Sequence, residues 1–505
     1  MAAGSTIVNH PLYTKWLSTW MKALDVYEGS GGFLEDDKPY LVPHPREWLD
    51  HSVQATGSDG TLGMVPNPNP SKPSPKLTMR RKLARYENLA ATILDAVTAS
   101  LFHQPAVRTA ATEGAIIEQW WANVDGKGTG IVAALQDAFT VAGVFGHTIL
   151  MLEKVDEEAV TAADVRLPRL CCYTPLDLID WLIDDRTGEL QAVKLLEPEP
   201  RTDFEPQLAD QFRVRVVDAT TWTLYDKAGK VIESGDHGFG RLPIAVLYAR
   251  RRPLSQFIGK PVLGDPQLFI DAYNLTSEVR ELLRNQTFAI LNVPLGKDGD
   301  VNVEQARMGQ QSGTANVLFS GEAAQFISPP GDNVQAYHEH LDRLGRMIYR
   351  LSSVPWDGDS RDAESADSRR LKRQEMVASL AKYASELTRT EETLIELVYR
   401  AVHGEQWQAK LEADQVTLRY PDTFEPPDLE ALTAHVSAAL GLDLGATATK
   451  ELKKHTAHTL LPHAPLEVKE QITAEIDAMK VLSEEEKRQQ MLDDATARMA
   501  GAFGG

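Results

Sequence analysis

The stretch that decides the fold is QAYHEHLDRLGRMIYRLSSV (335–354), followed by PWDGDSRDAESADS (355–368) and RRLKRQEMVASLAKYASELTRTEETLIELVYRAVHG (369–404). In its first part, apolar residues recur every three or four positions, which predicts one buried helical face made of Tyr337, Leu341, Leu344, Ile348 and Leu351. This helix is predicted to end at Val354, because the residue before a proline is held out of the helical region.

The acidic segment that follows is rich in Asp, Ser and Gly, which favour non-helical backbone. A second, longer helix is then predicted, because apolar residues at helical spacing continue for about nine turns of 3.6 residues. Those residues are Met376, Leu380, Tyr383, Leu387, Leu394, Val398 and Val402. Gly404 is a natural end for it. Taken alone, the block is also compatible with an ordinary helical hairpin inside a globular domain.

Composition describes a folded globular protein whose charge is strongly acidic. The 505 residues are 43% hydrophobic and 25% charged, and 72 acidic against 52 basic residues give a net charge of −20. Tight DNA binding needs many Lys and Arg to neutralise phosphates, so this balance argues against an extended basic DNA footprint. It permits a basic partner, or a DNA that passes without sticking.

The cysteines and the hydropathy of the sequence indicate in which cellular setting the protein is expected. Cys171 and Cys172 are adjacent and are not expected to bridge each other, so an intracellular, reducing setting is the simpler interpretation. The sequence has no apolar run long enough for a membrane span, and its start lacks the apolar core of a secretory signal. We therefore expect no membrane partner.

The rest of the chain predicts an α+β fold that is predominantly helical. Helices are expected at 77–102 and 265–288, a β-rich antiparallel subdomain at 169–248, and strand-like runs between turns at 289–333. Residues 407–424 are predicted as strand plus loop. Four more helices are expected near the end of the chain, at 429–440, 446–460, 466–479 and 483–499.

Taken in order, these elements resemble the portal, or head-to-tail connector, proteins of tailed bacteriophages. The resemblance is carried by the helix ending in LFHQP (101–105), by IDAYNLTSEVRELLRN (270–285), by GTANVLFSGEAAQFISPPG (313–331) and by RLGRMIYRLSSVPWDGDSRDAESADSRRLKRQ (343–374). It covers about residues 77–424, and its weight lies in the order of the segments.

The resemblance implies a subunit with wing, stem, clip and crown parts that assembles into a ring, usually of twelve copies. Carried onto this chain, the parts are a wing at 1–264, stem helix 1 at 265–288, a clip at 289–333, stem helix 2 at 334–354, a tunnel loop at 355–368, a return to the wing at 369–425, and the crown and C-terminal helices at 426–505.

The resemblance also implies a role and partners. The ring would sit at one vertex of the virion capsid, assembled in the host cytoplasm, as the channel for packaging and ejection of double-stranded DNA. Its partners would be the terminase large subunit, the head-completion or adaptor protein, and the major capsid and scaffold proteins. No enzymatic activity and no cofactor are implied.

Three groups of residues are the candidate sites. The tunnel loop contributes Trp356, Asp357, Asp359, Arg361, Asp362 and Glu364 to the DNA channel. On the stem, Arg343, Arg346 and Arg350 lie opposite the apolar face of their helix, where they either contact the DNA backbone weakly or form ion pairs between subunits, helped by Glu339. The charged residues of the clip, Lys297, Asp298, Glu304 and Arg307, are candidates for docking the motor or adaptor.

Other functions are open from the sequence. The carboxylates of Asp357, Asp359, Asp362, Glu364 and Asp367 form a cluster of the kind that binds Mg²⁺ in nucleases, although no base or lysine supports it. His455, His458 and His463 suggest zinc, although Pro462 interrupts their helix. DGKGTG (125–130) lacks the spacing of a phosphate loop, so a plain turn is expected. A capsid-associated structural protein without a DNA channel is the remaining alternative.

Overall fold

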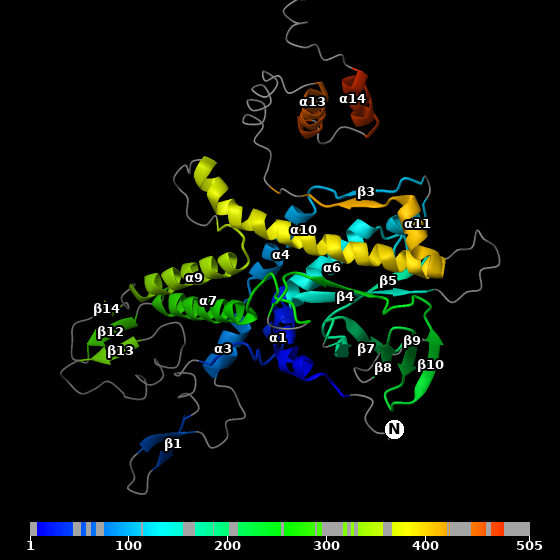
Figure 1. Cartoon of the computed structure of the whole chain (residues 1–505). Helices are drawn as coiled ribbons and strands as arrows, with labels where there is room; N and C mark the ends of the chain where they lie inside the picture. The colour runs from blue at the N-terminus through cyan, green and yellow to red at the C-terminus, as the bar shows by residue number, and fades with distance from the viewer. Residues whose placement is uncertain are drawn as a thin grey trace, which may run out of the picture. The chain divides into compact units, whose positions relative to one another are not determined.

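The chain divides into two compact units, Met1–Phe424 and Glu425–Gly505. The fold is that of a computed structural model, which describes residues 8–43, 52–56, 62–66, 75–112, 115–154, 167–184, 186–200, 211–253, 257–287, 290–294, 317–320, 325–327, 332–356, 366–421, 424, 446–460 and 466–478. The architecture is mixed α+β, as Figure 1 shows. None of the described helices is long and apolar enough to cross a membrane.

A three-stranded antiparallel sheet lies in the core of the first unit. Its central strand, β4 (His147–Glu153), pairs with β11 (Ile244–Tyr248) on one side and β5 (Arg169–Tyr173) on the other. The first six residues of β4 are all buried, so the usual alternation is missing. A strand lacks alternation between buried and exposed residues when both of its faces are covered. Helices α6 (Ile131–Phe145) and α10 (Ala366–His403) both pack on this sheet.

The β-rich segment predicted at 169–248 is confirmed, but it contributes to two sheets. Five of its strands form an antiparallel meander in sequence order, namely β6 (Leu178–Ile183), β7 (Leu190–Pro198), β8 (Phe212–Val217), β9 (Thr221–Tyr225) and β10 (Val231–Asp236). The first and last strands of the segment, β5 and β11, pair with β4 instead. Periodicity predicts strands but not their partners, because pairing depends on the whole chain.

The single helix predicted at 77–102 is wrong in one respect, because the structure has two helices there. Helix α3 (Pro75–Leu83) is separated from α4 (Leu89–Leu101) by five residues. The side chain of Asn88 accepts a hydrogen bond from the amide of Ala91 at 3.0 Å, which caps α4. Tyr86, in the break, donates its hydroxyl to the carbonyl of Val26 at 2.8 Å. The apolar periodicity continued across the break and concealed it.

Helix α10 is the longest element, and its 38 residues span about 57 Å at 1.5 Å per residue. Leu380, Tyr383, Leu387, Leu394 and Val398 of the predicted apolar face are buried. Figure 1 shows α10 crossing the body of the first unit, where it contacts α4, β11 and β4. The predicted long helix is therefore confirmed, including its end beside Gly404.

The prediction of strand plus loop at 407–424 is wrong for its first half. A short 3-10 turn, Gly404–Gln406, leads into α11 (Trp407–Asp414), and only Thr417–Arg419 forms a strand, β15. Ala, Lys, Leu and Glu in WQAKLEAD are strong helix formers. The Arg400 guanidinium also lies over the Trp407 ring, 4.1 Å from its centroid, which holds the start of α11 against α10.

The remaining elements complete the first unit and give a helical pair in the second. In the first unit they are α1 (Pro11–Glu28), a 3-10 turn at Gly31–Phe33, the hairpin β1 (Ser52–Thr56) and β2 (Leu62–Pro66), α5 (Ile116–Ala122), and β3 (Val107–Thr109), which pairs with β15. In the second unit, α13 (Ala446–Leu460) and α14 (Leu466–Ala478) pack together, joined by a Lys454–Asp477 ion pair of 2.7 Å. Both helices lie where the sequence predicts them; the helices expected at 429–440 and 483–499 fall outside the described residues.

Candidate functional site

The candidate site is a helical hairpin with a small sheet at its turn. Helix α7 (Pro266–Thr287) and helix α9 (Asp332–Leu351) pack side by side (Figure 1). Between them in the chain lie β12 (Ile290–Pro294), β13 (Val317–Ser320) and β14 (Gln325–Ile327), which form one sheet in the order β13-β12-β14. The two helices lie close to their predicted bounds of 265–288 and 334–354.

Buried residues and the hydrogen bonds of two polar side chains, Asn274 and Ser277, anchor α7 to the body of the first unit. Phe269 and Tyr273 are 2% and 3% exposed. Asn274 accepts a hydrogen bond from the amide of Val42 at 2.7 Å and donates one to the carbonyl of Tyr40 at 2.9 Å. The buried Arg80 of α3 donates to the hydroxyl of Ser277 at 3.1 Å. This hydrogen bond from a buried guanidinium links α3 to α7.

Helix α9 has one buried face and one cationic face. Leu344 and Ile348 are 5% and 1% exposed, whereas Arg343, Arg346 and Arg350 are all exposed. The separation predicted from the sequence is thus confirmed. Leu351 is the exception, because it is 41% exposed although the pattern places it on the apolar face. It is the last residue of the helix, where the packing surface ends.

Within the described part of the chain, Arg343 and Arg350 form no ion pair. The expected helper Glu339 instead accepts a hydrogen bond from the side chain of Gln335 at 3.1 Å.

The end of α9 is closed by a tight backbone motif that the sequence did not reveal. Ser353 has a left-handed φ of +59°, and the amide of Val354 bonds to the carbonyl of Tyr349 at 3.0 Å. The chain then turns back so that Trp356 packs edge-on against Tyr349, with ring centroids 4.8 Å apart. The Trp356 ring also fills the space above Gly345, where an added Cβ would lie 3.1 Å from it. Trp356 is therefore held against α9.

The other predicted tunnel-loop residues, Asp357, Asp359, Arg361, Asp362 and Glu364, lie outside the described residues. The same is true of Lys297, Asp298, Glu304 and Arg307 between β12 and β13. The structure therefore places the sheet but none of the proposed docking residues. Among the described residues, no group of three His, Cys, Asp or Glu is arranged to hold a metal.

Three consecutive arginines after β11 connect the hairpin to the body, a role that the sequence did not indicate. Arg250 donates to the carbonyls of Val262 and Leu351 at 3.1 and 3.3 Å, so it binds the exposed carbonyl end of α9. Arg251 lies over the Tyr248 ring and bonds to both oxygens of Glu386 on α10, at 2.8 and 2.9 Å. The sequence showed three consecutive positive charges here, but not which residues they bind.

Arg252 completes this basic turn. It donates to the carbonyl of Gly259 at 3.0 Å and its guanidinium lies 4.5 Å from the centroid of Trp16. Burial without a carboxylate lowers the pKa of Arg252. The three arginines thus tie the end of α9, the middle of α10 and the start of α1 to one short segment.

A buried ion pair also fixes α10, five residues beyond Glu386. Arg108 of β3 donates to both carboxylate oxygens of Glu391, at 2.6 and 2.8 Å, and Tyr420 donates to Glu391 at 2.7 Å. Glu391 is fully buried. Burial opposes the charge, but the Glu391 carboxylate prevails and raises the pKa of Arg108. This group joins the β3–β15 pair to α10. Nothing in the sequence pointed to it, because Arg108 and Glu391 lie 283 residues apart.

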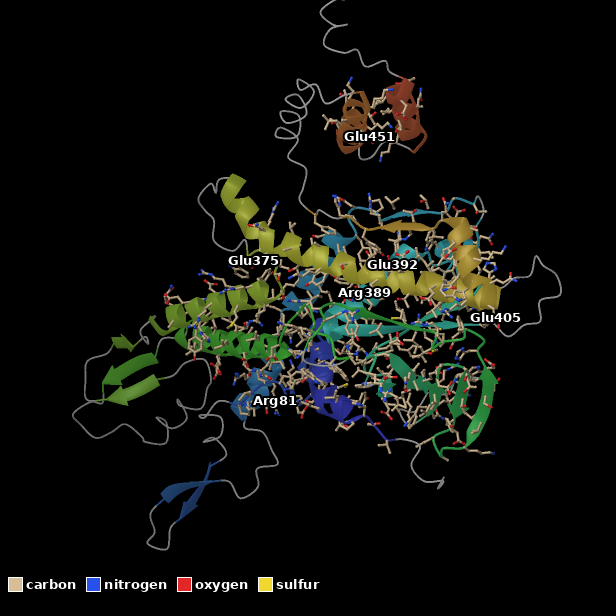
Figure 2. The ribbon with its side chains drawn as sticks, viewed as in Figure 1. Arg81, Glu375, Arg389, Glu392, Glu405 and Glu451 are labelled. Atoms are coloured by element: carbon tan, nitrogen blue, oxygen red, sulfur yellow. The ribbon has the colours of Figure 1, made fainter. Side chains whose placement is uncertain are left out.

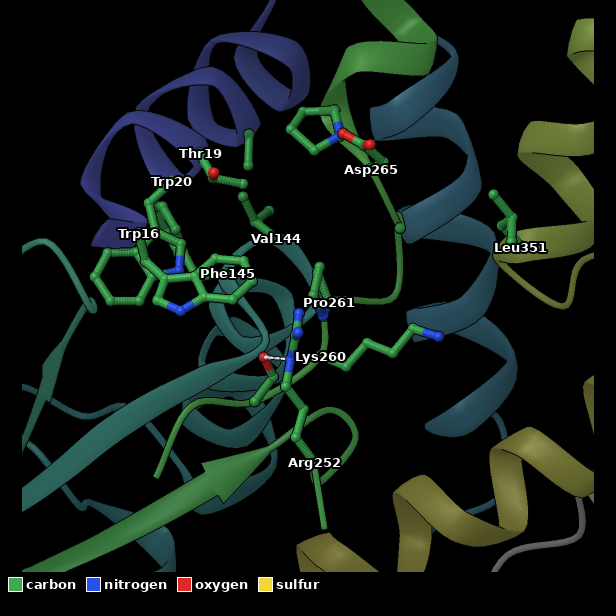
Figure 3. Close-up of a pocket in the computed structure, with 14 residues that line it drawn as sticks. Trp16, Thr19, Trp20, Val144, Phe145, Arg252, Lys260, Pro261, Asp265 and Leu351 are labelled. Carbon is green, nitrogen blue, oxygen red and sulfur yellow. Dashed lines mark hydrogen bonds between the residues drawn. The ribbon is translucent and has the colours of Figure 1, made fainter. Parts of the chain in front are cut away.

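A cavity of about 410 Å³ lies where α7 begins and α9 ends. Figure 3 shows its walls, with Trp16 and Trp20 from α1, Phe145 from the end of α6, Pro261, and Leu351. Its carboxylate, Asp265, accepts a hydrogen bond from the amide of Gln267 at 2.9 Å and so caps α7. The lining is mostly apolar, and its charged residues are Arg252, Lys260 and Asp265.

The glycine-rich turn at 125–130 is a closed turn, as expected. Asp125 accepts hydrogen bonds from the amides of Lys127 and Thr129 and from the hydroxyl of Thr129, at 2.7–3.1 Å. These bonds, the Thr129 hydroxyl first, lower the pKa of Asp125 to about 2. The amide of Gly128 bonds to the side chain of Asn123 at 2.8 Å. The amides of Lys127, Gly128 and Thr129 are therefore already hydrogen-bonded within the turn.

Comparison with known proteins gives one family match and several structural similarities. A family model described as a domain of unknown function, DUF4055, matches residues 266–400, which run from the start of α7 to near the end of α10. No curated protein matches the sequence at a significant level.

Among solved structures, the chain is similar to a chain from the neck of an empty gene transfer agent (GTA) particle computed with C6 symmetry. The two are 13% identical, the match covers 75% of this chain and 94% of that chain, and the TM-score is 0.41. It is similar at 11% identity to a chain in the virion of the native particle, and at 12% to one in its neck computed with C12 symmetry. Both of these cover 69% of this chain and 83% of the other, with TM-scores of 0.34.

Proposed function

We propose that this chain is a portal subunit, which assembles into a ring at one capsid vertex and forms the channel for double-stranded DNA. In this proposal α7 and α9 are the stem, the β12–β14 sheet is part of the clip that meets the terminase motor and later the adaptor, and α10 is the wing helix. The observation that carries it is the continuous order of α7, small sheet, α9 and long α10, with an exposed arginine face on α9.

The charges of the subunit suit a passage through which DNA moves. Each subunit carries −20, and a ring multiplies that charge by the number of copies. Such a field repels phosphate and prevents tight, static binding. The exposed Arg343 and Arg350 supply weak local attraction within that field. Together they favour transient backbone contacts over sequence-specific binding.

The decisive experiment is native mass measurement and negative-stain imaging of the purified chain. The expected result is a closed ring with a central hole wide enough for a DNA duplex. A monomer that cuts DNA in a divalent-dependent manner would overturn the proposal and favour the carboxylate cluster at 357–367 as a nuclease site. A closed assembly without a central hole would favour a structural capsid protein that carries no DNA.

A second experiment tests the loop after α9. Deletion of residues 357–365 retains Trp356, which packs on α9, so rings are expected to form as in the wild type. DNA packaging or retention in particles is expected to fall. Loss of ring assembly would instead show that the segment is structural. A Lys127→Glu change in the turn at 125–130 is a suitable control because Lys127 is exposed and distant in sequence from the hairpin.

A further inference from the structure

A cleft of about 430 Å³ on the first unit combines an apolar floor with an arginine rim. We call its apolar lining residues, which include Phe257 and Leu190, the floor, and its lining arginines, Arg241, Arg251 and Arg389, the rim. We refer to it as the arginine cleft. It is bounded by β11, the turn between β6 and β7, and the middle of α10. It shares no lining residue with the cavity at the base of the hairpin.

At and beside this cleft, two carboxylates each serve two arginines. Glu386 bonds to Arg251 at 2.8 Å and lies 4.0 Å from Arg389, so one carboxylate serves two guanidinium groups. Glu396 likewise serves Arg241 at 3.0 Å and Arg400 at 2.7 Å. Among the lining residues themselves, the charged side chains are Arg241, Arg251 and Arg389 and one carboxylate, Glu189. Arg389, 63% exposed, is the most accessible of these three arginines. The lining residues therefore carry a net positive charge, whereas the whole subunit carries −20.

The complementary surface occurs on the same chain. Leu34 is 71% exposed, and the three residues after it, Glu35, Asp36 and Asp37, are all exposed. We refer to residues 34–37 as the acidic loop. An exposed leucine followed by three carboxylates matches an apolar floor with a cationic rim, both in charge and in polarity.

Packing and hydrogen bonds on both sides of the acidic loop anchor it to the first unit. Phe33, directly before it, is 2% exposed and stacks on Tyr86 with ring centroids 4.0 Å apart. The amide of Lys38 bonds to the carbonyl of Glu35 at 3.0 Å, and the Lys38 ammonium bonds to the carbonyl of Ala84 at 3.0 Å. A loop that is already ordered loses little conformational entropy on binding.

The two surfaces belong to different parts of the first unit. The acidic loop is tied through Lys38 to the end of α3, the helix that carries Arg81, whereas the cleft is marked by Arg389 on α10. Figure 2 shows Arg81 and Arg389 well apart. Two different patches that meet between copies make a head-to-tail contact, and such a contact generates a ring when the rotation between successive copies closes.

We infer that the acidic loop of one copy docks in the arginine cleft of the next, with Leu34 on the apolar floor and the three carboxylates facing Arg389, Arg241 and Arg251. This inference rests on the proposed ring. It adds the pair of surfaces through which neighbouring copies recognise each other.

A charge-swap experiment tests the contact directly, with native mass measurement of the full-length chain as the readout. Arg389→Glu and Asp36→Lys are each expected to reduce the ring population at least tenfold, and the double variant is expected to restore it. Arg389→Glu mixed with Asp36→Lys should also form mixed assemblies. The matched controls are Lys127→Glu and Glu405→Lys, both exposed and outside the two surfaces, which are expected to assemble like the wild type.

The outcomes separate this contact from the proposed function. If the wild type forms rings and both single variants form them equally well, the docking inference is overturned and the portal proposal stands. If single variants lose rings, keep their thermal stability and are not restored by the swap, the two residues do not face each other and the inference is also overturned. If the wild type is monomeric, both proposals fail together.

Discussion

The body of the first unit and the α7–α9 hairpin use the same residue type in opposite ways. In the body, Arg108 and Arg250 are bound to a carboxylate or to carbonyl groups within the subunit. On α9, Arg343 and Arg350 are exposed and unpaired within the described part of the chain. Arg108 and Arg250 therefore hold elements of the subunit together, whereas the two arginines of α9 are presented outward. Variants of these residues should differ accordingly in their effect on stability.

Removal of the buried carboxylate should have the largest effect. Glu391→Ala leaves the guanidinium of Arg108 buried without its partner, and such a break lowers the free energy of unfolding by about 3 to 5 kcal/mol. Urea unfolding measures it. Glu392→Ala, at the exposed neighbouring position, should change it by less than about 0.5 kcal/mol. Similar values for the two variants would mean that the body does not depend on this pair.

The body also contains a buried neutral histidine, which makes it acid-sensitive. Burial lowers the pKa of His147 to about 3, from 6.5 in the unfolded chain. The unfolded state therefore binds more protons below pH 6.5, and stability falls as the pH is lowered through that window, by about 1.4 kcal/mol per unit. Its ring is surrounded by Trp20, Tyr248 and Phe257, so Phe is a conservative replacement.

His147→Phe should remove this contribution, which is about 2 kcal/mol between pH 7 and pH 5. The measurement is the difference in unfolding free energy between the two pH values, compared with the wild type. The exposed His338, replaced by Ala, serves as the control. An unchanged pH dependence in His147→Phe would show that the buried imidazole is not the acid-sensitive group.

The junction between the two regions should show an intermediate effect. Arg250→Ala removes the bonds to Val262 and to the end of α9 at Leu351, and should destabilise the chain by about 1.5 kcal/mol. Amide hydrogen exchange should rise most in the last turn of α9. The exposed Arg284 of α7, changed to Ala, is the control. Equal exchange in both variants would show that the end of α9 does not need Arg250.

The exposed arginines should have the smallest effect on folding. Arg343→Ala and Arg350→Ala are expected to change the unfolding free energy by less than about 0.5 kcal/mol. Binding of a short DNA duplex at low salt should weaken, and its dependence on salt concentration should become shallower. Unchanged DNA binding together with a loss of oligomers would assign these arginines to contacts between subunits.

Helices and faces were predictable because local periodicity carries that information. The apolar residues of α9 and α10 repeat at helical spacing, so Leu344, Ile348 and Leu394 were placed correctly without any partner. The outward position of Arg343 and Arg350 followed from the same geometry. The break between α3 and α4 was harder to predict. One capping hydrogen bond, at Asn88, starts a new helix without disturbing the apolar pattern.

Most helical and β-rich segments, the cationic face of α9 and the acidity of the chain follow from the sequence alone. The folded structure was needed to show that Arg250, Arg251 and Arg252 fasten three separate helices, that Glu391 joins Arg108 and Tyr420, and that Trp356 lies against Gly345. The difference lies in how far apart in the sequence the interacting residues are. A helical face is set by neighbours within one turn, whereas a buried ion pair or a packed ring depends on residues brought together only when the chain has folded.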